Sequence, residues 1–135
     1  MARCAILDDY QNCSLGFADW SSLKDTTVKN FTSFVVPDQL ANELAGFEII
    51  VAMRERTVFN AQLLASLPKL NLLVTTGMRN SSIDMDAAKQ NGITVCGTKS
   101  LAYPAPELTW GLILGLDDTY QLKPLRFALV AGRRR

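Results

Sequence analysis

Short apolar runs alternate along this chain with segments typical of helices, and this alternation restricts the fold more than any other feature. Strands are expected over residues 4–7, 26–31, 48–53, 70–76 and 93–96. Helices are expected between them, over residues 13–23, 39–45, 60–67 and 81–90, with Ser14 and Asn60 as caps. Strands joined by helices of this length form right-handed βαβ units and a parallel sheet. The sequence therefore predicts an α/β fold, a flavodoxin-like parallel five-stranded sheet with helices on both faces.

One more helix is expected after the last strand, and it is unusual in being apolar nearly all round. Pro104 and Pro106 suit the first turn of a helix, where Glu107 also meets the positive helix end. Apolar residues then dominate residues 108–116. Because such a helix needs cover on more than one face, we expect a homodimer that forms through residues 105–116.

These elements divide the chain into three parts. Residues 1–101 are predicted to form the flavodoxin-like domain, and residues 102–119 a bridging or dimerisation helix. Residues 120–135 are either an irregular tail or a short strand, and the sequence favours neither.

Composition removes several classes of function. The net charge of +1 creates no strong positive potential that would attract nucleic acid. No segment approaches the ~20 apolar residues of a membrane span. The chain has no histidine, and its three cysteines share no CxxC spacing, so we predict no metal site and no disulfide framework. The apolar stretch after Met1 is too short for a signal peptide, and a reducing cytoplasmic compartment is expected.

Ligands of open α/β sheets bind beyond the carboxyl ends of the strands, and the loop at residues 76–82 is the best candidate there. Gly77 permits a tight turn, and Ser81 and Asp84 have the spacing of a capping box for the next helix. Free backbone N–H groups, the helix end and the Arg79 guanidinium would together hold a carboxylate or phosphate. The alternative is an ordinary strand–helix turn whose arginine faces solvent.

Two other strand ends carry candidate residues. Arg54 directly follows a strand. It serves either as a ligand contact or as a surface ion-pair partner of Glu55. Asp8, Asp9 and Tyr10 follow the first strand. The paired acids there could bind a metal or act as acid and base, and the alternative is a simple helix cap or rim contact.

Several segments resemble the D-isomer-specific 2-hydroxyacid dehydrogenase family, in particular its phosphoglycerate dehydrogenase-like members. They are MRERT (53–57), LVTTGMRN (73–80), SID (82–84), GITVCGT (92–98) and ELTW (107–110). The resemblance implies a substrate domain in which the loop at Gly77, Met78, Arg79 and Asn80, following Thr76, receives a carboxylate through backbone N–H groups. It also implies that Arg54 lines the substrate pocket and that residues 107–116 form a helix that bridges to an NAD domain and packs in a dimer.

The chain also departs from the family pattern. It has no counterpart of the family's GxGxxG loop or of its catalytic Arg, Glu and His, so we expect a truncated relative that binds no cofactor and transfers no hydride. Its expected function is to bind a small carboxylate or a homologous subunit. One alternative is a repurposed, cofactor-free isomerase, cyclase or lyase that uses Arg54, Arg79, Asp8 or Tyr10 in the groove of a dimer. Another is a remnant without a selected function.

Overall fold

The computed structural model describes residues 1–99 and 101–116, and the chain divides into one unit before Leu101 and a second from Leu101 onward. The strands of the first unit are β1 (Ala2–Ile6), β2 (Thr26–Asn30), β3 (Ile49–Ala52), β4 (Leu72–Thr75) and β5 (Thr94–Gly97). Its helices are η1 (Ser14–Gly16), η2 (Trp20–Ser22), α1 (Pro37–Leu44), α2 (Ala61–Ala65) and α3 (Met85–Gln90). The second unit contains α4 (Pro104–Leu116). The predicted tail at residues 120–135, and residues 117–119 of the predicted bridging segment, lie outside the described residues.

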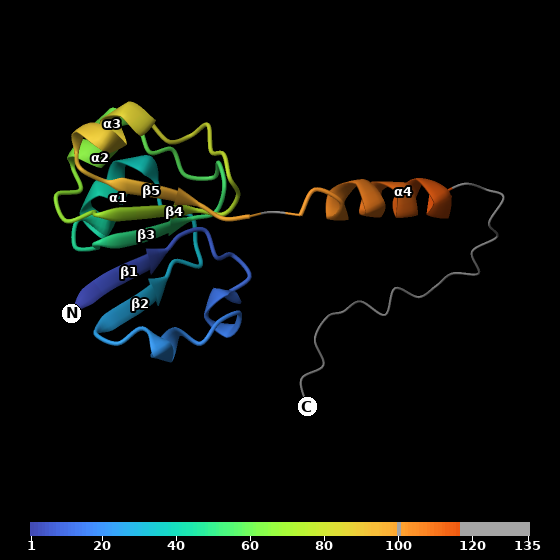
Figure 1. Cartoon of the computed structure of the whole chain (residues 1–135), viewed down its shortest axis with the longest axis horizontal. Helices are drawn as coiled ribbons and strands as arrows, with labels where there is room; N and C mark the ends of the chain where they lie inside the picture. Colours follow the sequence, from blue (N-terminus) through green and yellow to red (C-terminus); the bar gives the residue numbers. More distant parts are fainter. Residues whose placement is uncertain (100, 117–135) are drawn as a thin grey trace. The chain divides into compact units, whose positions relative to one another are not determined.

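The five strands form one parallel sheet in the order β2-β1-β3-β4-β5 (Figure 1). This is the strand order of the flavodoxin-like doubly wound fold, so the predicted fold class is confirmed. The parallel direction places the carboxyl ends of all five strands at one edge of the sheet.

The main core lies on the face of the sheet that carries the three α-helices, which are grouped together in Figure 1. Ala5, Ile50 and Leu73, neighbours in β1, β3 and β4, are completely buried there. Leucines and alanines of the helices pack against them: Leu40, Leu44, Leu63, Leu64, Ala87 and Ala88. The connection from β1 to β2 runs in the opposite direction along the sheet, so right-handed crossover places η1 and η2 on the other face.

The predicted helix over residues 13–23 is wrong, because two short 3-10 turns occupy this segment instead. Ser14 caps no helix: its hydroxyl donates to the Asp9 carboxylate at 2.7 Å, and its backbone N–H donates to the same group. The Asp19 carboxylate accepts from the backbone of Ser21 and begins the second turn. Local side-chain bonds of this kind compete with a continuous helix.

Helix α4 in the second unit begins at Pro104 and is apolar on every side, as the sequence predicts. Its large apolar side chains are between 52% and 82% exposed in the single chain: Leu108, Trp110, Leu112, Ile113, Leu114 and Leu116. None of the described helices has the length and apolar content to cross a bilayer.

Candidate active site at the carboxyl edge of the sheet

The loop that follows β4 is held in a defined shape by bonds to its neighbours. Gly77 has φ +113°, a conformation that favours glycine, and its N–H donates to Thr98 Oγ1 at 2.9 Å. The Gly77 carbonyl accepts in return from the Thr98 N–H at 3.2 Å. A Cβ at Gly97 would lie 2.7 Å from that carbonyl oxygen, so both glycines are needed where the β4 and β5 ends meet.

Asn80 fastens this loop to the end of β3. Its Nδ2 donates to the Arg54 carbonyl at 2.6 Å and to Thr75 Oγ1 at 2.9 Å, while its Oδ1 accepts from the Ser82 N–H at 2.9 Å. Thr76 Oγ1 accepts from the Arg54 N–H at 3.1 Å. The backbone of Arg54 is thus bound on both sides by the loop at residues 76–80.

Arg54 itself has a strained backbone, with φ +52° in a residue that carries a side chain. Its guanidinium lies against Gly77, since a Cβ there would lie 3.0 Å from Arg54 Nη1. Its ion pair with Glu55, at 3.6 Å, joins two exposed side chains and contributes little to stability. The guanidinium can therefore exchange Glu55 for another carboxylate at little cost.

The free donors of the loop are fewer than the sequence predicts. Among the described residues, the N–H groups of Met78 and Arg79 have no hydrogen-bond partner, whereas that of Gly77 is taken by Thr98. The side chains of Met78 and Arg79 are exposed, and that of Asn80 is half-buried. Among these residues the backbone N–H of Asn80 has no partner either, so three open N–H groups and the Arg54 guanidinium remain as donors for an anion.

The prediction that Ser81 begins a capping box is wrong. Helix α3 starts at Met85, and Asp84 is its cap, with Oδ1 accepting from the Ala87 N–H at 2.9 Å. Residues 82–84 stay extended because the Phe59 N–H donates to the Ser82 carbonyl at 2.7 Å and the Asp84 N–H to the Phe59 carbonyl at 3.0 Å. The helix end therefore contributes nothing to the loop at residues 76–80.

Asp8 and Tyr10 form a separate cluster with Arg56 and Thr57. Asp8 is buried, and its carboxylate accepts from the Tyr10 hydroxyl at 2.7 Å and from Thr57 Oγ1 at 2.8 Å. Arg56 Nη1 donates to the Asp8 carbonyl at 2.9 Å, and its guanidinium lies 5.0 Å from the centre of the Tyr10 ring. The hydrogen bond to Asp8 raises the pKa of the Tyr10 phenol, which therefore stays protonated at neutral pH.

Among the described residues, no hydrogen bond or ion pair joins this cluster to Arg54, Arg79 or the loop at residues 76–80. The four residues predicted as one catalytic set, Asp8, Tyr10, Arg54 and Arg79, thus lie at the same edge of the sheet in two separate groups. Within residues 1–99 and 101–116, no three His, Cys, Asp or Glu residues are placed to hold a metal ion.

Asp9 organises this end of the sheet, and its role goes beyond the cap or rim contact that the sequence predicts. It is buried and accepts from Asn30 Nδ2 at 2.9 Å, the Cys13 N–H at 3.0 Å and both donors of Ser14. Burial raises the pKa of this carboxyl, but the hydrogen bonds outweigh burial and hold the pKa well below its usual range. The Asn and Ser that lie near Asp9 in the sequence were the available signal for this role. The partner Asn30 could not be found in that way, because it lies 21 residues away along the chain.

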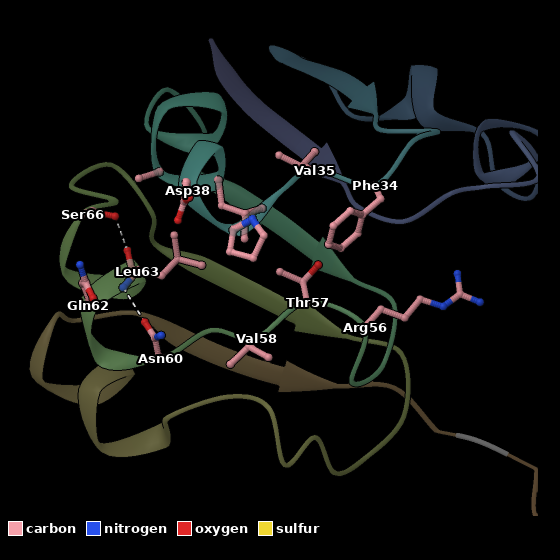
Figure 2. A pocket seen from close by; sticks show the side chains of 13 residues that line it. Phe34, Val35, Asp38, Arg56, Thr57, Val58, Asn60, Gln62, Leu63 and Ser66 are labelled. Carbon is pink, nitrogen blue, oxygen red and sulfur yellow. Dashed lines mark hydrogen bonds between the residues drawn. The ribbon is translucent and has the colours of Figure 1, made fainter.

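A cavity of about 660 Å³ lies between α1 and α2, on the helix-covered side of this edge (Figure 2). Figure 2 shows Phe34, Val35 and Val58 around it, with Arg56 and Thr57 at one end. None of residues 76–80 lines this cavity. This cavity is therefore separate from the loop predicted to bind an anion.

Comparison with known proteins agrees with the fold and with the motifs at this edge. Residues 5–109 match the sequence model of the catalytic domain of D-isomer specific 2-hydroxyacid dehydrogenases. A glycerate dehydrogenase of Methylorubrum extorquens is 33% identical over an alignment of 110 residues, and the match covers 74% of this chain and 34% of that protein.

Solved structures give the same result. A phosphoglycerate oxidoreductase from Vibrio cholerae superposes with a TM-score of 0.77 at 37% identity, over 85% of this chain and 37% of that one. A D-3-phosphoglycerate dehydrogenase-type structure from Ralstonia solanacearum gives 0.76 at 36% identity, over 85% and 35%. The chain spans about a third of the length of these relatives. It belongs to the D-isomer specific 2-hydroxyacid dehydrogenase family, and its matched segment is that family's catalytic domain.

Proposed function

We propose that the loop at residues 76–80, together with Arg54, binds the carboxylate of a small 2-hydroxy acid or 2-oxo acid. The observation that carries this proposal is the strained Arg54, which is bound on both sides by Thr76 and Asn80 and lies against Gly77. Strained residues persist where the surroundings fix them, and they cluster at ligand sites. The open N–H groups of Met78, Arg79 and Asn80 supply further donors, and the exposed Arg79 side chain carries a second positive charge.

We propose further that the 135 residues bind this ligand without transferring hydride themselves. Hydride transfer needs a nicotinamide and a proton donor, and this chain contains no histidine. The nicotinamide dinucleotide that the family implies does not fit the described residues. At the end of β1, where dinucleotide folds have a glycine turn beside the pyrophosphate, this chain has the buried carboxylates of Asp8 and Asp9.

The partners proposed for the chain are the small carboxylate and a second copy, joined through residues 105–116. Support for the homodimer comes from the exposure of every large apolar side chain of α4. The cytoplasm is the proposed compartment, with support from three cysteines that form no disulfide. The cofactor-free isomerase, cyclase or lyase has weaker support, because Asp8 and Tyr10 bind each other and Thr57 rather than the loop.

Affinity measurements on the purified chain test the proposed ligand. D-Glycerate should bind in calorimetric titration, and glycerol, which lacks the carboxylate, should not. Arg54→Ala should weaken glycerate binding roughly 10- to 100-fold, because a hydrogen bond to a charged group contributes about 1.5–3 kcal/mol. Lys24→Ala removes one exposed positive charge before β2, at the opposite edge of the sheet, and should leave the affinity unchanged. Equal weakening in both variants would attribute binding to net charge and refute the site.

A further inference from the structure

Thr98 is the first residue after β5, and its hydroxyl lies against the loop at residues 76–80. The Gly77 N–H donates to Thr98 Oγ1 at 2.9 Å. The Thr98 N–H in turn donates to the Thr75 carbonyl at 3.1 Å and to the Gly77 carbonyl at 3.2 Å. Gly97, paired with Thr75 in the sheet, brings the end of β5 into close contact with the loop. These bonds fix the position of the Thr98 hydroxyl where the ends of β4 and β5 meet.

The Thr98 hydroxyl has a proton that remains available. A threonine hydroxyl can donate one proton and accept through two lone pairs. In Thr98 one lone pair accepts from Gly77, and the described residues provide no acceptor for the proton. The Thr76 hydroxyl differs, because it donates to the Ala52 carbonyl at 3.5 Å. Since the Thr98 side chain is exposed, its O–H group is open to a ligand.

This O–H group belongs to the same part of the loop as the open N–H groups. Met78 directly follows Gly77, and its N–H has no partner among the described residues. A carboxylate has two oxygens and about four lone-pair positions, so it can accept from a hydroxyl and from a neighbouring amide together. A hydroxyl that donates to a carboxylate also forms one of the shorter and stronger hydrogen bonds in proteins.

Charge favours an anion near the ends of β3, β4 and β5. Arg54, Arg79 and Lys99 lie in the segments that follow these strands, and their side chains are exposed. The same segments contain a single acid, Glu55, over residues 53–59, 76–82 and 98–104. The end of β1 is different, since two aspartates follow it. A carboxylate is therefore attracted to the side of the edge where Thr98 lies.

We propose that the Thr98 hydroxyl is a further direct contact of the ligand carboxylate, accepting from the Gly77 N–H while it donates its own proton to the ligand. This inference rests on the proposed binding of a small 2-hydroxy or 2-oxo acid at residues 76–80. Hydrogen bonds in a chain polarise one another, so the Gly77 N–H strengthens the contact between Thr98 and the ligand. The Gly77 N–H thus contributes to binding although it does not touch the carboxylate.

A competing arrangement makes the opposite prediction. The carboxylate could displace the Thr98 hydroxyl and accept directly from the Gly77 N–H. Binding would then require the bond between Thr98 and Gly77 to break, so the hydroxyl would oppose binding. Removal of the hydroxyl weakens binding in the first arrangement and strengthens it in the second.

Three variants distinguish these arrangements by calorimetric titration with D-glycerate. Thr98→Val keeps the shape of the side chain without the hydroxyl and should weaken binding roughly tenfold or more, the loss expected for one hydrogen bond to a charged group. Thr98→Ser retains the hydroxyl and should restore most of the lost affinity. Thr94→Val removes an exposed hydroxyl at the other end of β5 and should bind as the unaltered chain does.

Methyl NMR tests the same contact in the unaltered chain. During titration with D-glycerate, the Thr98 methyl signal should move saturably, with the same dissociation constant as the Met78 amide signal. The Thr94 methyl signal should not move.

Equal or tighter binding by Thr98→Val would overturn the contact and leave the proposed carboxylate site intact. A stationary Thr98 methyl signal beside a moving Met78 amide signal would have the same meaning. If the unaltered chain showed no saturable binding of D-glycerate, the proposed function itself would be refuted together with this inference.

Discussion

Asn80 shows how one side chain can fix the geometry of a ligand loop. It links the end of β3, through the Arg54 carbonyl, to the end of β4, through Thr75, and it also begins the following turn at Ser82. Its position in a motif predicts Asn80 as a site residue. Its anchoring role could not be predicted, because the bond to Arg54 spans 26 residues. The bond that removes the Gly77 N–H as a free donor could not be predicted either, because its partner Thr98 lies 21 residues away.

Replacing Asn80 should therefore affect both stability and binding. Asn80→Ala leaves the Arg54 carbonyl and the Thr75 hydroxyl without their partner and should lower the free energy of unfolding by about 1–3 kcal/mol. Glycerate affinity should fall with it. Asn71→Ala, at an exposed position where the described residues provide no side-chain hydrogen bond, should change neither quantity in urea unfolding and calorimetry. If Asn80→Ala were as stable as Asn71→Ala, the proposed anchoring role would be wrong.

Asp9 predicts a specific dependence of stability on pH. Its pKa in the folded chain lies below the ordinary aspartate value of about 3.9, so the unfolded chain binds more protons between the two values. The stability that this carboxylate contributes is complete above about pH 4 and is lost as the pH falls toward the folded pKa.

Urea unfolding of the unaltered chain and of Asp9→Asn at pH 6, 4 and 3 measures this contribution. The variant should be less stable at pH 6, and the difference between the two proteins should shrink as the pH falls. A difference that stays constant over this range would show that the Asp9 charge does not contribute.

At the scale of elements, the sequence predicted the existence and order of the strands and of α1 to α4 better than their ends. Apolar runs identify β3 and β4 because both strands are central in the sheet. The predicted ends of the elements are wrong where contacts with a distant segment outweigh local propensity. Ser81 and Asp84 have a capping-box spacing, yet the bridge between Phe59 and Ile83 keeps residues 82–84 extended, and α3 starts only at Met85. The failed helix at residues 13–23 has a similar cause, since Asp9 takes both donors of Ser14.

The start of α3 can be tested with two alanine substitutions three residues apart. Asp84→Ala removes the bond to the Ala87 N–H and should cost about 1 kcal/mol of unfolding free energy. Ser81→Ala should stay within about 0.5 kcal/mol of the unaltered chain. Chemical denaturation of both variants measures the difference in unfolding free energy. A larger loss of stability in Ser81→Ala than in Asp84→Ala would support the capping box instead.

At the scale of the whole molecule, the described residues combine a well-packed helix face in the first unit with the exposed apolar side chains of α4 in the second. The sequence indicated the character of α4, because that helix is apolar all round. It did not indicate which face of the sheet carries the helices, because the strands read as continuously apolar. The chain spans about a third of the length of its relatives, so the proposed binding of a carboxylate by the loop at residues 76–80 is what can be tested on it directly.

The most direct test of the central claim is a titration of the isotopically labelled chain with D-glycerate, followed through its backbone amide NMR signals. The account predicts saturable movement of the Met78 and Arg79 amide signals, with little movement for Val58 and Gln62 at the α1–α2 cavity and none on addition of glycerol. Movement confined to the cavity residues, or no saturable movement at Met78 and Arg79, would contradict it.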